Sequence, residues 1–89
     1  RLKTLNLFGN SLTKVPDSFG SLTNIYELSL GGNELTSLPA SIGNLKNLNI
    51  LDLSDNQLTT LPNELSKLTN LEYLSIRNNQ ISNFPDSLK

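Results

Sequence analysis

The chain has 89 residues, a formal net charge of −1 at pH 7, and neither cysteine nor histidine. Its length allows one modest hydrophobic core, and its near-zero charge gives no electrostatic reason to bind nucleic acid or an anionic membrane. Because cysteine and histidine are absent, Ser-His-Asp and Cys-His catalysis and thiolate or imidazole metal sites are excluded, so we predict no catalytic residue, no metal site and no cofactor.

One pattern recurs along the chain with a fixed period. Its copies begin at Leu2, Ile25, Leu48 and Leu71, each 23 residues after the one before, without insertion or deletion. A constant period of this size is typical of a stacked repeat array. We expect one domain over 1–89, cut from a longer array and made of the repeats 2–24, 25–47 and 48–70 and a partial repeat 71–89.

The first eleven residues of each unit follow L-x-x-L-x-L-x-x-N-x-L. The L-x-L alternation predicts a short strand with one buried face, and strands that follow identical return segments must pair in parallel. The ninth position is always asparagine, whose side chain offers a donor and an acceptor to turn backbone groups that the sheet leaves free. We therefore predict a structural ladder of hydrogen-bonded asparagines, formed by Asn10, Asn33, Asn56 and Asn79.

The second half of each unit returns the chain to the next strand. Proline recurs there, and apolar residues follow it at spacings of three and four. Proline suits the first turn of a helix, where its missing N–H costs nothing. The pattern predicts one or two turns of α- or 3₁₀-helix, with Gly20 and Gly43 fitting a break within or after that turn. The recurring prolines are Pro16, Pro39, Pro62 and Pro85.

These four copies resemble the leucine-rich-repeat family over essentially the whole chain. The return motif L-P-x-x-[LI]-x-x-L is most similar to the 23-residue class of Ras-suppressor and Ras-scaffold proteins, plant intracellular Ras-group repeat proteins, and bacterial and protist repeat proteins. The resemblance implies an α/β repeat solenoid, a right-handed arc with a concave parallel sheet and short helical, 3₁₀ or extended segments on the convex side. It also implies protein binding on the concave sheet, without enzymatic activity.

Outward strand positions vary from unit to unit while the leucines do not, as expected for side chains free of the packing constraint. Exposed aromatic residues and arginine are the types enriched at interface hot spots. We expect Tyr73, Arg77 and Ile50 to lie close together, with Asp52 beside them. Aromatic and β-branched residues also simply favour strands, and that interpretation stays open. The predicted partner-binding residues are Tyr73, Arg77, Ile50, Asp52, Glu27, Phe8, Tyr26, Ser54 and Ser75.

The favoured function is a non-catalytic protein-interaction module in intracellular signalling or scaffolding, with a small GTPase or another signalling protein as candidate partner. Two alternatives stay open. The chain could be the targeting or autoregulatory segment of a larger GTPase, phosphatase, kinase or cyclase, or it could be a structural spacer or bacterial surface protein. Core-type side chains left uncovered at the ends would also allow end-to-end self-association.

The compartment is predicted from what the sequence lacks. No apolar run reaches the roughly 18 residues of a transmembrane helix, so we expect no membrane insertion, and no targeting segment is visible. Small secreted domains often rely on disulfides, so the lack of cysteine favours a reducing compartment, the cytoplasm. The absence of an Asn-x-Ser/Thr sequon agrees with this. A bacterial origin would explain the missing sequon equally well, and a secreted or surface location in a bacterium stays open.

Overall fold

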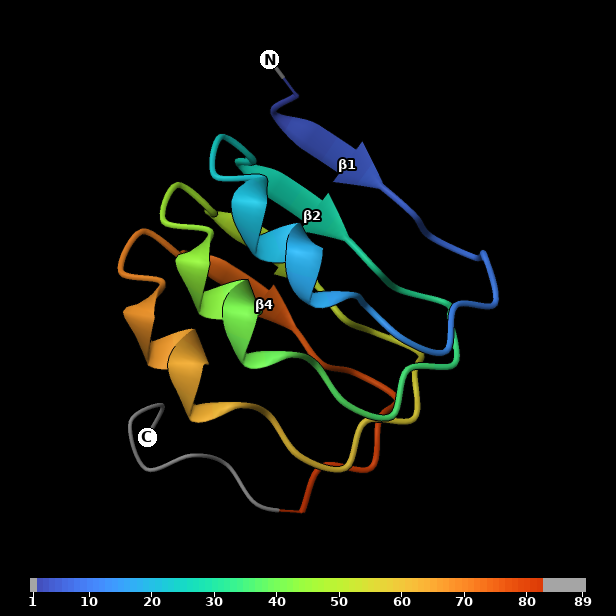
Figure 1. Cartoon of the computed structure of the whole chain (residues 1–89). Helices are drawn as coiled ribbons and strands as arrows, with labels where there is room; N and C mark the ends of the chain where they lie inside the picture. The colour runs from blue at the N-terminus through green and yellow to red at the C-terminus, as the bar shows by residue number, and fades with distance from the viewer. Residues whose placement is uncertain (1, 83–89) are drawn as a thin grey trace.

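The computed structural model describes residues 2–82. Arg1 and the fourth return segment, predicted around Pro85, lie outside the described residues. Short strands alternate with single 3₁₀ helices, and Figure 1 shows each of the first three strands continuing into a connection that leads to the next 3₁₀ helix and back to the sheet. The elements are β1 (Thr4–Asn6), η1 (Asp17–Ser21), β2 (Glu27–Ser29), η2 (Ala40–Asn44), β3 (Ile50–Asp52), η3 (Asn63–Lys67) and β4 (Tyr73–Ser75).

The strands form one parallel sheet in the order β1-β2-β3-β4. The register is the same at each junction: Thr4 pairs with Glu27, Glu27 with Ile50, and Ile50 with Tyr73. Paired residues are 23 positions apart in the sequence, so the register of the sheet follows directly from the 23-residue period. The predicted solenoid with a parallel sheet is confirmed.

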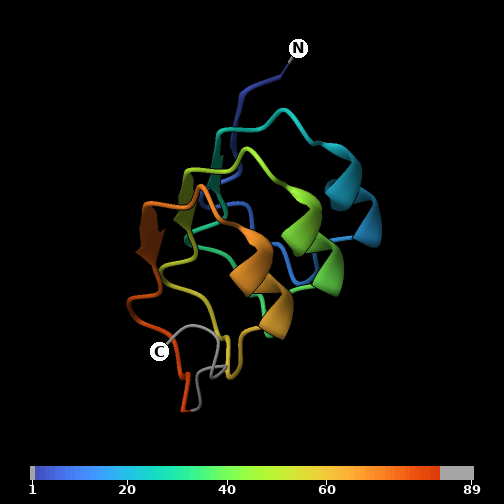
Figure 2. The same ribbon diagram turned by 90° about the vertical axis from the view of Figure 1, so that its left-hand side faces the viewer.

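The leucines of the pattern fill the space between the sheet and the 3₁₀ helices, which form opposite layers in Figure 2. In the two inner units the side chains of Leu28 and Leu51 have 0% of their surface exposed. Their equivalents in the first and last units, Leu5 and Leu74, are only partly buried. Each unit therefore needs a neighbour on both sides to complete its core, as in other repeat arrays.

Each of the three return segments that the structure describes contains a 3₁₀ helix, which begins one residue after the proline. Pro16 is the N-cap of η1, with φ −70° and ψ 154°, and Pro39 and Pro62 cap η2 and η3 in the same extended conformation. The carbonyl oxygen of Pro16 accepts a hydrogen bond of 3.1 Å from the N–H of Phe19. The prediction that proline lies inside the first helical turn is therefore wrong. Each proline is the last extended residue before its 3₁₀ helix, and its carbonyl oxygen accepts the first hydrogen bond of that helix.

The prediction that the helical turn breaks at Gly20 and Gly43 is also wrong. Both glycines lie inside their 3₁₀ helices and are buried. A Cβ atom on Gly20 would lie 2.9 Å from the Cβ of Ser41, and one on Gly43 would lie 2.6 Å from the carbonyl oxygen of Glu64. These positions need glycine because the next 3₁₀ helix passes too close for any side chain.

Candidate functional site

The outward side of the sheet is a continuous surface built from all four strands. We call it the concave face and define it as the outward side chains of residues 3–8, 26–31, 49–54 and 72–77. Because side chains alternate along a strand, the pairing register places equivalent residues of successive units in rows across this face. One row is Thr4, Glu27, Ile50 and Tyr73, and the next is Asn6, Ser29, Asp52 and Ser75.

The structure brings part of the predicted cluster together. Tyr73 pairs with Ile50, and Asp52 pairs with Ser75 on the same two strands. Tyr73 is 57% exposed, whereas Ile50, Asp52 and Ser75 are half-buried. Arg77 is exposed but lies beyond the end of β4, four residues from Tyr73, which is about 13 Å of extended chain. The expected compact cluster is therefore two patches, with Ser75 between them.

Phe8 and Ser54 occupy different environments at the strand exits. The Phe8 ring lies over two glycines of the next unit: a Cβ on Gly31 would meet its Cδ2 at 3.0 Å, and one on Gly32 would meet its Cζ at 3.2 Å. The ring itself remains 55% exposed. Ser54 is only 9% exposed, so the expectation that it faces solvent is wrong. Its hydroxyl lies 3.1 Å from the Cβ position of Gly31, beside the space that the Phe8 ring covers.

Two consecutive N–H groups share one backbone acceptor where β2, β3 and β4 begin. The N–H groups of Tyr26 and Glu27 both donate to the carbonyl oxygen of Lys3, at 2.7 and 3.1 Å. The side chains of Tyr26 and Glu27 are both exposed. In the sequence these two residues are the variable pair between the first two apolar positions of L-x-x-L, which indicates that neither of them packs in the core. The arrangement recurs with Asn49 and Ile50 on Tyr26, and with Glu72 and Tyr73 on Asn49.

The side chains of the ninth-position asparagines form hydrogen bonds that join the end of each strand to the preceding unit. The Asn56 Nδ2 group donates to the carbonyl oxygens of Leu30 (3.0 Å), Leu53 (3.1 Å) and Ser54 (3.2 Å), and its Oδ1 accepts from the N–H of Leu35 (3.0 Å). Within residues 2–82 these amides bond backbone groups and not one another. Equivalent bonds are made by Asn33 and Asn79, while Asn10 donates to Phe8 at 3.4 Å.

A second row of asparagines, which the sequence analysis missed, lies at the opposite edge of the sheet, meaning the side where the strands begin. It consists of Asn24, Asn47 and Asn70, one just before each unit boundary. The Nδ2 group of Asn47 donates to the carbonyl oxygen of Thr23 at 3.0 Å, and that of Asn70 donates to Lys46 at 2.9 Å. Recurrence of asparagine at the 23-residue period was the signal that could have found it.

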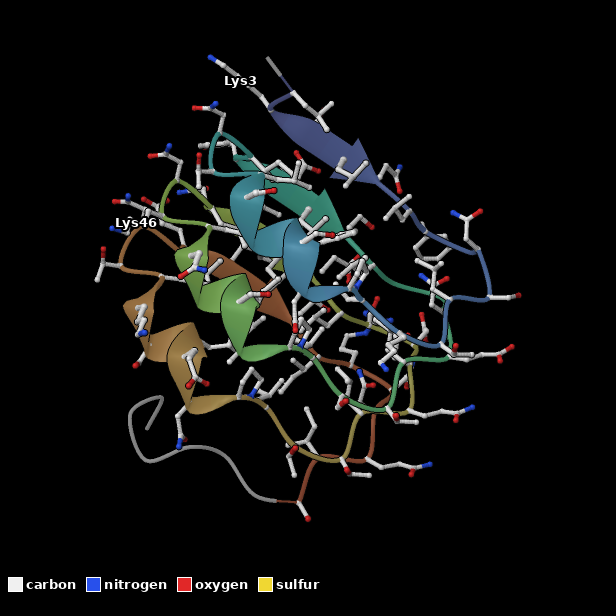
Figure 3. The ribbon with its side chains drawn as sticks, in the orientation of Figure 1. Lys3 and Lys46 are labelled. Carbon is white, nitrogen blue, oxygen red and sulfur yellow. The ribbon has the colours of Figure 1, made fainter. Side chains whose placement is uncertain are left out.

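This edge carries an open groove of about 760 Å³. Figure 3 shows Lys3 at the start of β1 and Lys46 in the turn before β3, both at this edge. We call the hollow the edge groove. It is lined by Lys3, Thr4, Asn24, Tyr26, Asn47, Asn49, Asn70 and Glu72.

In residues 2–82 no group of three or more acidic, histidine or cysteine side chains is arranged to hold a metal ion. None of the helices in that range combines the length and the apolar character needed to cross a membrane.

Stacked strand-and-return units with one parallel sheet and an asparagine ladder define a repeat solenoid. The family model described as "Leucine rich repeat" matches residues 23–81, and a model of two leucine-rich repeats matches residues 1–43. The chain belongs to the leucine-rich-repeat family. No curated protein sequence gives a significant match.

Solved leucine-rich-repeat structures are similar to this chain. A leucine-rich-repeat protein of Leptospira interrogans is 41% identical, with a TM-score of 0.95 over 98% of this chain and 22% of its own. A chain of the BIR3–SERK2 complex from Arabidopsis thaliana is 39% identical, with a TM-score of 0.86 over 98% and 49%. A chain of the TLR13–ssRNA13 complex is 35% identical, with a TM-score of 0.83 over 94% and 12%. The chain thus spans less than half of each of them.

Proposed function

We propose that this chain is a protein-interaction module that binds a protein partner on its concave face. The observation that carries the proposal is where its aromatic side chains lie. In residues 2–82 the exposed aromatic residues, Phe8, Tyr26 and Tyr73, all belong to the strand side and are 55%, 49% and 57% exposed. Phe19, in a return segment, instead packs against the core.

The surroundings of Tyr73 support a contact role. Its ring stands beside half-buried Ile50, so a partner that covers both would bury apolar area without displacing a charge. Half-buried Asp52 follows Ile50 on β3, and exposed Arg77 forms a separate patch beyond the end of β4, so both would supply charged contacts away from the apolar pair. An apolar or aromatic centre with a polar rim is the usual composition of a protein-binding hot spot.

A protein partner fits the charge of the chain better than a nucleic acid does. The printed names of the similar structures include a protein–protein complex and a complex with single-stranded RNA. RNA binding rests on neutralising phosphates, and this chain has a net charge of −1. Its basic residues are also spread over different elements. Lys3 precedes β1, Lys67 is the last residue of η3, and Arg77 follows β4.

The size of the concave face supports a shared interface. Four strands cover roughly 15–20 Å across and roughly 17 Å along the chain, a projected area of about 300 Å². A standard interface buries about 800 Å² on each partner. We infer that this segment contributes part of a binding face to which further repeats contribute. The resemblance to Ras-related repeat proteins makes small GTPases the first partner class to test.

The test compares three forms of the chain with matched thermal melts. The concave variant is Tyr73→Ala/Arg77→Glu, and the control is Asn63→Ala/Lys67→Glu, which makes the same charge change on the exposed surface of η3. Each form is used for affinity capture from native cell extract, and the retained protein is then titrated against each form.

We expect the wild type and the control to retain one partner. The concave variant should bind that partner at least about tenfold more weakly, which is about 1.4 kcal/mol. Equal binding by all three forms would contradict the concave-face assignment.

A further inference from the structure

The edge groove has a distribution of charge that the concave-face proposal does not use. Lys3 lies at one end, in the first unit, and Glu72 at the other, in the fourth, and both side chains are exposed. Tyr26 lies between them, 49% exposed. Lys46, in the turn before β3, is at the same edge but does not line the groove. The groove is therefore positive at one end and negative at the other, with one aromatic ring between the two charges.

The asparagines of the groove present hydrogen-bond acceptors. The Nδ2 groups of Asn47, Asn49 and Asn70 donate to the carbonyl oxygens of Thr23, Asn70 and Lys46, at 3.0, 3.0 and 2.9 Å. Because one N–H of each amide is held by a backbone carbonyl oxygen, the amide is fixed in orientation and keeps its Oδ1 acceptor, together with its second N–H, for a ligand. Within residues 2–82 none of these oxygens accepts a hydrogen bond. Such a row suits a ligand rich in N–H donors, as a polypeptide backbone is.

The separation of the two charges sets the spacing of the ligand's own charges. Lys3 and Glu72 occupy equivalent positions three strand spacings apart, which is about 14 Å. An extended peptide advances about 3.3 Å per residue and covers that distance in about four residues. A helical segment would need about nine residues at 1.5 Å each, with its side chains turning away from the groove.

We propose that the edge groove binds an extended peptide segment of a protein, with an acidic side chain at Lys3 and a basic side chain about four residues away at Glu72. The volume, about 760 Å³, lies within the range of peptide- and ligand-sized sites. The segment lies across the strands, over the Tyr26 ring, and its N–H groups donate to the asparagine oxygens. The groove shares Tyr26 with the concave face but is lined by neither Tyr73 nor Arg77, so the two sites are tested separately.

The experiment selects peptides from a displayed library of random 12-residue sequences on the immobilised 89-residue chain. The charge-reversed groove variant is Lys3→Glu/Glu72→Lys, which keeps the net charge. The matched control, Lys14→Glu/Glu34→Lys, exchanges one exposed lysine and one exposed glutamate outside the groove. A fourth selection uses Tyr73→Ala/Arg77→Glu. All forms are first shown to have matched thermal melts.

The proposal expects the wild type, the control and the Tyr73→Ala/Arg77→Glu variant to enrich one order of acidic and basic residues, about four apart. The charge-reversed variant should enrich the opposite order and bind the wild-type peptides at least tenfold more weakly. No enrichment, the same peptides from every form, or loss of selection only in the Tyr73→Ala/Arg77→Glu variant would each overturn it. Capture of neutral oligosaccharides from an array without peptide selection would also overturn it, by assigning the groove to glycans.

Discussion

At the residue scale, the two rows of asparagines at opposite edges of the sheet differ in burial and in the number of hydrogen bonds that each side chain makes. The strand-exit asparagines are buried in the inner units, where Asn33 and Asn56 are each 7% exposed. Asn56 bonds three carbonyl oxygens and one N–H group that have no access to water as an alternative partner. Asn47 in the edge row is exposed and donates one bond. The first row is expected to stabilise the fold, and the second to shape the edge groove.

Replacing Asn56 by alanine should lower the free energy of unfolding by about 3 kcal/mol, because buried backbone groups lose their partners. The matched change Asn47→Ala, which leaves an exposed carbonyl group to water, should cost less than about 1 kcal/mol. Urea unfolding of the three proteins measures both values. Equal losses would show that burial does not distinguish the two rows.

The residue scale also explains a position that the repeat pattern leaves variable. Gly9, Gly32, Asp55 and Asn78, one in each unit, all have positive φ, between 57° and 74°. Glycine, asparagine and aspartate are the residues that tolerate this left-handed conformation. The position is thus constrained in backbone conformation although its side chain changes from unit to unit.

At the element scale, the 3₁₀ helices stack through their small residues. The Cβ of an alanine at Gly43 would lie 2.6 Å from the Glu64 carbonyl oxygen, and backbone atoms cannot rotate out of the way. In the third unit the equivalent residue is Ser66, which is exposed. Glycine is therefore required where an adjacent 3₁₀ helix covers the position, and the proline that precedes each helix supplies its N-cap and first acceptor.

We expect Gly43→Ala to destabilise the chain by about 2 kcal/mol through overpacking, and so to lower Tm by about 10 °C. Gly9→Ala is the control, because φ there is +74° but nothing lies within 4 Å of the added Cβ. Its cost should be the left-handed backbone conformation alone, about 1 kcal/mol, or about 5 °C in Tm. Thermal melts followed by circular dichroism compare the two variants. A smaller effect at Gly43 than at Gly9 would contradict the close approach of η2 and η3.

At the scale of the whole molecule, the inner units hold the core together. Leu51 in β3 is completely buried between two neighbouring units, whereas Leu5 in β1 is partly buried and has one neighbouring strand. Stability in such an array is the sum of what each unit contributes and what each junction contributes. A change in an inner unit weakens two junctions and a change in β1 weakens one.

Leu51→Ala should therefore cost about 3–4 kcal/mol, since it leaves a cavity enclosed on every side. Leu5→Ala, the same substitution at the equivalent position of the first unit, should cost about 1.5 kcal/mol, because its surroundings are open to water. Guanidinium unfolding at equilibrium gives both values. If the two substitutions cost the same, the core is not completed by neighbouring units in the way described.

The period of 23 residues determined, from the sequence by itself, the parallel sheet, its register, the buried leucines and the positions of the strand-exit asparagines. This was possible because one leucine pattern is repeated, and equivalent residues in a stack must lie beside each other. Only the tertiary structure decided how neighbouring units touch. It showed that Gly20 and Gly43 are contact points and that Ser54 is buried beside Phe8. Those facts depend on distances between atoms of different units, and a pattern within one unit carries no information about such distances.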